Sequence, residues 1–223
     1  HQLTRRQRQM CIRDREREPF EWKETKHLWP VVAPETGRVE ILNDVVFNNS
    51  VQNKVTHFAD NFDTAQLDLN WNFRRYPIED VYKINKEENR LNLFCHPNQI
   101  KERGRAALLG FKQTESDFEY LTQMYFQPKS SDSEAGISLF QKDDNYINFT
   151  IIKKGDKHQL QVYAIKNGEI LELIKHELRQ YKGNIKFKVI ADKDVYKLYY
   201  SLKGMDFKLF ASLEGSYLKS NGY

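Results

Sequence analysis

The stretch AGISLFQKDDNYINFTIIK, residues 135–153, alternates apolar and polar or small side chains on both sides of a short polar segment. Alternation with a period of two is typical of a strand that buries one face. The segment KDDN, residues 142–145, interrupts it with Asp and Asn, whose side chains bond nearby backbone and tolerate left-handed conformations. The stretch therefore predicts a β-hairpin that turns at 142–145. Its predicted core-facing residues are Ile137, Leu139, Ile147, Phe149 and Ile151.

The segment before this hairpin, DFEYLTQMYFQ at 117–127, is rich in aromatic and β-branched residues and ends at Pro128. A stretch without apolar residues, 129–134, separates it from the hairpin. We interpret residues 117–152 together as an antiparallel pair. The adjacent carboxylates of Asp143 and Asp144 could suggest a catalytic pair, but acids between two strands are typical of solvated turns, and we interpret them so.

Short strand patterns continue on both sides of this region. Turn-forming residues recur every 8–12 positions, and no helix-length segment with a 3.6-residue period competes with them. The dipeptide Asn167-Gly168 lies between two alternating runs and predicts a two-residue hairpin turn with positive φ at both positions. Many short strands with regular turns indicate an all-β sandwich or barrel, and we predict a sandwich of stacked antiparallel sheets. The predicted strand segments are FADNFD (58–63), 67–77, 81–95, 105–113, 158–178 and 184–213.

Composition and charge exclude several classes of protein. The 223 residues are 39% hydrophobic and 13% aromatic, which suffices for a core, and no apolar run approaches the roughly 20 residues that cross a membrane. Of 35 basic residues six lie in 1–17, and of 31 acidic residues two do, leaving 29 of each in the rest of the chain. The excess charge thus belongs to a tail without interleaved aromatics, so we expect neither a nucleic-acid nor a membrane partner. The two cysteines form no disulfide or zinc framework.

An ordered set of motifs carries a family resemblance. The motifs are DNFD (60–63), LxxxW (67–71), RxP (75–77), LxL (91–93), RAALLGFKQT (105–114), FxYxTxMxFxP (118–128), EAGI (134–137), NYINF (145–149) and YYSLKG (199–204). This set resembles the concanavalin A-like β-sandwich at the C terminus of family 43 glycoside hydrolases, which are β-xylosidases and α-L-arabinofuranosidases. The segment WPVVAPETGRVEI at 29–41 is similar to the end of that family's five-bladed catalytic propeller. The RAALLGFKQT motif is looser than usual, because Lys112 stands where an arginine often precedes the glutamine.

The resemblance implies a division of the chain. We expect a concanavalin A-like, jelly-roll type β-sandwich over 58–223, preceded by the tail of a propeller at 19–44 and a linker at 45–57. Residues 1–18 are a disordered basic arm, a clipped helix, or sequence foreign to the protein. We favour the last, because MCIRDR resembles translated adaptor sequence. No secretory signal is visible in these residues. Because we expect the true N terminus to lie upstream, the sequence does not define the localisation of the protein.

The resemblance also implies what this chain does. Family members are inverting O-glycosidases whose three catalytic carboxylates lie in the propeller, upstream of these residues, so we expect no catalytic residue here. They also continue past Tyr223 with a loop and a last strand. We therefore expect an accessory domain that packs on the missing propeller of the same protein and helps to complete a pocket for xylo- or arabino-oligosaccharides. The alternative is an independent, lectin-like carbohydrate-binding module without catalysis.

Two sets of residues are candidates for binding. Trp71, Tyr146 and Tyr199 could offer flat faces for sugar stacking, although at strand spacing such residues are mostly core or interface. Asp60 and Asp63 could supply oxygen ligands to a structural calcium, or could simply flank Phe62 in an edge strand. We expect no metal or other cofactor in this chain itself, and a structural calcium at most in the whole enzyme.

Overall fold

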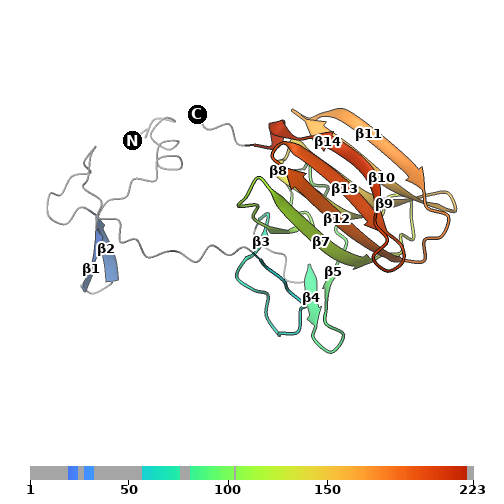
Figure 1. The fold of residues 1–223 in the computed structure, drawn as a ribbon. Helices are drawn as coiled ribbons and strands as arrows, with labels where there is room; N and C mark the ends of the chain where they lie inside the picture. Colours follow the sequence, from blue (N-terminus) through green and yellow to red (C-terminus); the bar gives the residue numbers. More distant parts are fainter. Residues whose placement is uncertain (1–19, 25–27, 33–56, 76–80, 103, 220–223) are drawn as a thin grey trace. The chain divides into compact units, whose positions relative to one another are not determined.

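The computed structural model describes residues 20–24, 28–32, 57–75, 81–102 and 104–219, and Figure 1 shows them coloured along the chain. The chain divides into two units, 1–57 and 58–223. The predicted tail at 1–18 and nearly all of the predicted linker at 45–57 lie outside the described residues. In the first unit, β1 (Phe20–Glu24) pairs with β2 (Leu28–Val32) as an antiparallel hairpin. The propeller origin of 19–44 remains a prediction.

The second unit contains two four-stranded antiparallel sheets, which face each other as two layers (Figure 1). One sheet, called here the β9 sheet, has the order β11-β10-β9-β8. The other, the β12 sheet, has the order β14-β13-β12-β7. The strands are β7 (Phe118–Tyr125), β8 (Glu134–Lys142), β9 (Asn145–Lys154), β10 (Lys157–Lys166), β11 (Glu169–Glu177), β12 (Asn184–Asp192), β13 (Val195–Ser201) and β14 (Lys208–Glu214).

Shorter elements complete the unit. β3 (Trp71–Phe73) pairs with β6 (Leu109–Phe111), and β4 (Tyr82–Asn85) pairs with β5 (Arg90–Leu93). A single 3-10 turn, η1 (Ser216–Leu218), follows β14. Within the described ranges there is no α-helix, and hence none that could span a membrane. All the pairings are antiparallel, so the predicted all-β sandwich is confirmed.

The core lies between the two long sheets and follows from the alternation in the sequence. Ile147, Phe149 and Ile151 of β9 point inward and are almost fully buried, as are Phe187 and Val189 of β12. The rings of Phe149 and Phe187 meet edge to face at 4.9 Å between centroids, a geometry that aromatic pairs prefer. Ile137 and Leu139 of β8 pack against the same cluster. The five residues predicted from residues 135–153 therefore do face the core.

The two predicted turns are also present. β8 and β9 pair across the turn at 143–144. β10 and β11 pair from Lys166 to Glu169, leaving Asn167 and Gly168 as a two-residue loop with φ of 53° and 84°. Both residues thus occupy the left-handed region that this turn requires.

Two predictions about individual strands are wrong. Residues 117–127 do not pair with the hairpin that follows. β7 instead pairs with β12, and the segment after Pro128 crosses from the β12 sheet to the β9 sheet. The alternation of β7 fixed which face is buried but not its neighbour, because each face-burying strand can join either sheet.

Residues 58–63 form no strand. The Oδ1 atom of Asp60 accepts the backbone N–H of Phe62 at 2.8 Å, and Phe62 has a φ of 55°. This local turn takes the place of the predicted edge strand, because a short Asp side chain competes with the sheet for backbone donors.

Candidate functional site

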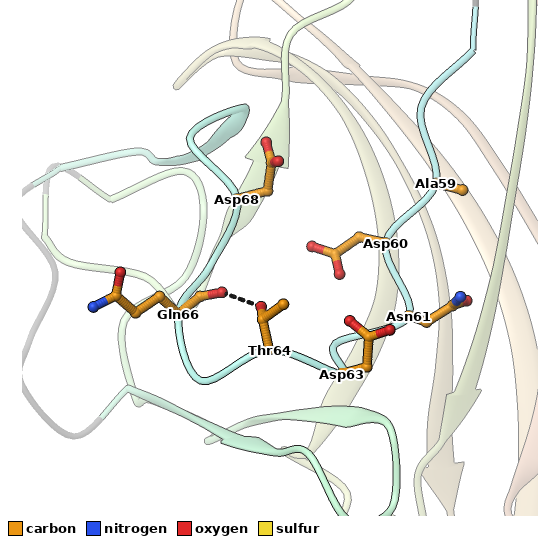
Figure 2. Close-up of a pocket in the computed structure, with 7 residues that line it drawn as sticks. All are labelled: Ala59, Asp60, Asn61, Asp63, Thr64, Gln66 and Asp68. Carbon is orange, nitrogen blue, oxygen red and sulfur yellow. Dashed lines mark hydrogen bonds between the residues drawn. The ribbon is translucent and has the colours of Figure 1, made fainter.

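The loop at 59–68 lines an open pocket of about 250 Å³ (Figure 2). Three carboxylates, those of Asp60, Asp63 and Asp68, lie along it. The other lining residues are Ala59, Asn61, Thr64 and Gln66. The pocket is thus polar and acidic, the character that the calcium hypothesis for Asp60 and Asp63 requires.

Two of the three carboxylates, those of Asp60 and Asp68, hold the loop itself. Asp60 accepts the N–H of Phe62 on Oδ1 and the indole N–H of Trp71 on Oδ2, at 2.8 and 2.7 Å. Asp68 accepts both the backbone and the side-chain N–H of Asn70 on one oxygen. Within the described residues, no three His, Cys, Asp or Glu side chains are grouped so as to hold a metal ion. The residues present therefore do not form the six- to eight-oxygen shell of calcium, and calcium stays a prediction from the sequence.

Trp71 lies in an aromatic cluster beside this loop. Its ring contacts those of Phe58, Phe62 and Phe111, with centroids 5.8–6.3 Å apart. Because the indole N–H donates a hydrogen bond to Asp60, both the apolar ring of Trp71 and its polar N–H edge have partners within the protein. The structure thus places Trp71 as the packing centre of the segment before β7.

Tyr146 lies on the outer face of the β9 sheet, yet it is only 4% exposed. Its ring stands 6.4 Å from that of Phe140 on β8 and 6.2 Å from that of Tyr163 on β10. Burial raises the pKa of the Tyr146 hydroxyl, and the negative charge of Glu134 adds to the increase. Tyr146 is therefore part of a closed aromatic row rather than a free platform.

Polar side chains continue this face next to Tyr146. Asn148 donates from Nδ2 to the hydroxyl of Tyr163 at 2.7 Å. Thr150 donates its hydroxyl to Glu134 at 2.6 Å, and Gln161 reaches the same carboxylate oxygen at 3.3 Å. Burial first, and then Glu134, raise the pKa of Tyr163. These residues were not candidates from the sequence, although their positions opposite Ile147, Phe149 and Ile151 in the alternation assign them to the outer face.

Tyr199 lies elsewhere, on the outer face of the β12 sheet. It is half-buried and opposes Lys188 across the β12–β13 pair. The Lys188 ammonium lies 5.5 Å from the Tyr199 ring centroid and 4.9 Å from that of Phe207, within the range of cation–π attraction. Tyr199, Tyr146 and Trp71 therefore belong to three different parts of the second unit and form no common binding surface.

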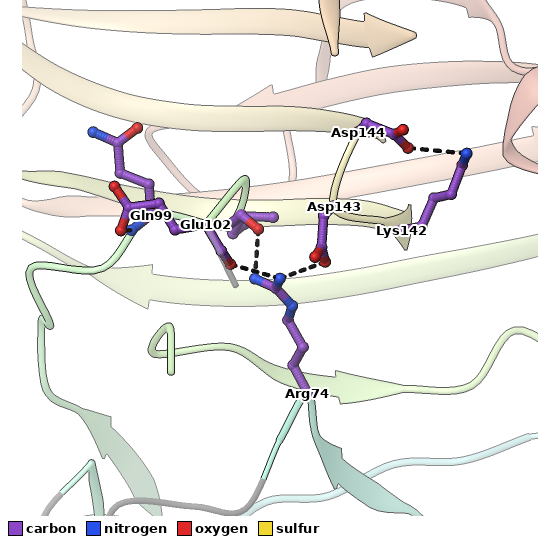
Figure 3. A network of polar contacts seen from close by, with 7 residues as sticks. Arg74, Gln99, Glu102, Lys142, Asp143 and Asp144 are labelled. Carbon is purple, nitrogen blue, oxygen red and sulfur yellow. Dashed lines mark hydrogen bonds and ion pairs between the residues drawn. The ribbon is translucent and has the colours of Figure 1, made fainter. Parts of the chain in front are cut away.

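The turn at 143–144 has a role that the sequence did not reveal (Figure 3). The guanidinium of Arg74, at the end of β3, donates to Asp143 and to the backbone carbonyl oxygens of Ile100 and Glu102. The Arg74 side chain is only 7% exposed and also covers the ring of Phe140 at 5.2 Å. Asp144 pairs with Lys142 at 3.1 Å. Asp143 thus lies in the predicted turn with a partly exposed side chain, and it also anchors the β8–β9 turn to the segment before β7.

Comparison with known proteins identifies relatives of this chain. Residues 59–223 match the profile of the family described as "Beta xylosidase C-terminal Concanavalin A-like domain". A curated xylosidase/arabinosidase of Butyrivibrio fibrisolvens is 28% identical over 147 residues, which are 65% of this chain and 28% of that protein. The chain thus spans just over a quarter of that relative.

Solved structures show the same fold. A xylan β-1,4-xylosidase from Bacillus halodurans superposes with a TM-score of 0.68 at 17% identity, over 92% of this chain and 40% of that one. A GH43 protein from Bacillus licheniformis gives 0.67 at 20% identity, over 92% and 39%. At this level of identity the likeness concerns the fold, and in each case the larger part of the other chain has no counterpart here.

Proposed function

Because this chain belongs to the family of β-xylosidase C-terminal concanavalin A-like domains, we propose that it is the accessory C-terminal domain of a glycoside hydrolase of the β-xylosidase or arabinofuranosidase type. The observation that carries this proposal is the family match over residues 59–223, together with the 39–40% share that the chain covers in the solved structures of a GH43 protein and a xylan β-1,4-xylosidase. A domain that makes up about two fifths of a longer chain would pack against the larger, remaining part of that chain.

The whole protein would hydrolyse O-glycosyl bonds in xylan or arabinoxylan, with inversion, by carboxylates outside these residues. This domain would pack against the catalytic propeller and help to complete the substrate pocket. Its outer surface supports such a partner. On the outer face of the β12 sheet, Leu121 and Tyr125 lie on β7 at one edge and Leu209 lies on β14 at the other. Each is about half exposed or more, and apolar exposure of this kind is found at interfaces.

The experiment uses the gene product that includes the region upstream of these residues. Hydrolysis of nitrophenyl β-D-xylopyranoside and α-L-arabinofuranoside is measured for the long chain and for the same chain without residues 58–223. We expect hydrolysis by the long chain and a large loss of activity or of soluble protein on deletion. Absence of hydrolysis by the long chain would refute the proposed glycosidase, and unchanged activity after deletion would refute the accessory role.

A further inference from the structure

We propose that the outer face of the β9 sheet is a binding site for a short, uncharged saccharide, with unpartnered hydrogen-bond acceptors on Ser138, Asn148 and Gln159. The face consists of rows that run across the four strands. Ser138, Asn148, Tyr163 and Leu173 oppose one another in one row, and Gly136, Thr150, Gln161 and Lys175 in the next. Neighbouring strands lie about 4.8 Å apart, so each row is roughly 14 Å wide, enough for a short oligosaccharide.

The polar side chains of this face are buried although they point away from the core. Asn148, Thr150 and Gln161 are each no more than 6% exposed. A solvent-facing sheet normally exposes its polar side chains, and a packed one carries apolar residues. Burying polar groups costs free energy unless every donor and acceptor has a partner. On this face that condition is only partly met.

Unpartnered polar atoms concentrate on this face. Six buried side-chain oxygens in the described part of the chain lack a hydrogen bond, and two of these, on Asp144 and Asp194, belong to ion pairs. Of the remaining four, Ser138 Oγ, Asn148 Oδ1 and Gln159 Oε1 belong to the outer face of the β9 sheet. Ser138 and Asn148 are direct cross-strand neighbours, and Gln159 lies two rows further along the same face, opposite Ile152. Native proteins rarely leave such groups without a partner, so the concentration indicates that a ligand supplies it.

The kind of atom defines the class of ligand. The amide oxygens of Asn148 and Gln159 only accept hydrogen bonds, and the nearby Glu134 carboxylate accepts as well. These acceptor atoms disfavour phosphate and other anions as partners and favour a ligand that presents several O–H donors. Sugar hydroxyl groups do this, and the half-buried ring of Tyr163 on the same face offers apolar contact for sugar C–H groups.

β8, an edge strand of this sheet, leaves one end of the second row without a side chain. Gly136, opposite Thr150, is exposed and brings no side chain to its row. A Cβ atom at this position would stand 2.2 Å from the carbonyl oxygen of Phe149, so no other residue fits without a shift of the backbone. The second row therefore has an open end at β8, beside the carboxylate of Glu134.

The choice of a xylose-based probe rests on the proposed function, while the site itself does not. The complete chain is titrated with xylotriose, with maltotriose as a second neutral saccharide and with inorganic phosphate as an anion, by isothermal calorimetry. The variants Ser138→Ala and Gln159→Ala each remove one unpartnered oxygen and break no hydrogen bond of the fold. The control Ser212→Ala makes the same change as Ser138→Ala, at an exposed position of β14 in the other sheet.

We expect millimolar or tighter binding of xylotriose, no binding of phosphate, and affinity at least threefold weaker in Ser138→Ala and Gln159→Ala but unchanged in Ser212→Ala. The melting temperature of the two test variants should stay equal or rise, because each loses an unpartnered buried atom. Binding of maltotriose alone would support the site and count against the xylan assignment. No saccharide binding, or equal affinity in all variants, would overturn the site while leaving the accessory role to its own test.

Discussion

Residues 117–214 and residues 58–111 hold their strands together in different ways. The first region forms the two long sheets, whose alternating apolar residues share one core. The second forms two pairs of strands three or four residues long, which depend on individual side chains such as Arg74 and Asp60. A large shared core keeps its strands together when a single polar contact is lost. A pair of short strands does not, because isolated two-stranded hairpins are barely stable in water.

The largest effect is expected in the shared core. Phe187→Ala removes a fully buried ring that packs edge to face on Phe149, and should lower the free energy of unfolding by about 4 kcal/mol in urea titrations. The control Phe111→Ala removes a ring that is 40% exposed in the other region, and should cost less than half as much. Equal losses would remove the distinction between the two regions.

The next largest effect is expected from removing a polar contact on which the short strand pairs depend. Arg74→Met keeps the length of the side chain and removes the donors to Asp143, Ile100 and Glu102. Because the guanidinium is nearly buried while Asp143 is partly exposed, we expect a loss of about 2 kcal/mol, below that for a fully buried pair. Hydrogen exchange should accelerate at 98–102 but not in β12.

The matched control for that change is Arg90→Met. Arg90 pairs with Glu88 where both side chains are about half exposed, so its loss should cost less than about 0.5 kcal/mol. Equal effects of the two arginine substitutions, or unchanged exchange at 98–102, would contradict the role given to Arg74.

A pH dependence tests whether the long-sheet region also has a polar anchor. Tyr181 is buried, and its hydroxyl donates to the carbonyl oxygens of Phe126 and Gly183. Burial raises its pKa from 10.0 to about 12. The folded state therefore favours the protonated hydroxyl, and this stabilisation is complete below pH 10 and is lost as the pH rises toward 12.

We expect unfolding free energy to fall by about 2 kcal/mol across that interval, measured by urea titration at each pH. Tyr181→Phe should flatten this part of the profile, although Tyr163 and Tyr217, whose pKa values are also raised, will leave some slope. An unaltered profile in Tyr181→Phe would contradict the assignment to Tyr181.

The smallest effect concerns the loop before β3. Asp60→Ala removes the acceptor of the Phe62 N–H and of the Trp71 indole N–H, and should cost about 1–2 kcal/mol. The fluorescence of Trp71 should shift to longer wavelength as its indole ring becomes more exposed to water. Asp63→Ala, which lies on the same pocket without these bonds, is the control. Identical shifts in both variants would show that Asp60 is not the anchor.

The sequence was most informative where a property is local. The hairpin at 135–153 and the Asn167-Gly168 turn were predictable, because alternation and positive φ depend on neighbouring residues only. The strand predicted at 58–63 failed because its apolar residues suggested a strand, while the Asp60 side chain bonds the backbone instead. Of the sugar-binding candidates, the pattern could not say that Tyr146 is closed by Phe140 and Tyr163.

By itself, the sequence determined that this protein is an all-β sandwich and which residues of its long strands face the core, because a period of two assigns side chains to faces whatever the partner strand. Only the tertiary structure decided that β7 joins the β12 sheet, that Arg74 and Asp143 meet, and that unpartnered oxygens gather on the outer face of the β9 sheet. Each of these depends on contacts between residues far apart in the chain. Which of these contacts form depends on the relative free energies of many possible pairings, and a local sequence pattern does not contain that information.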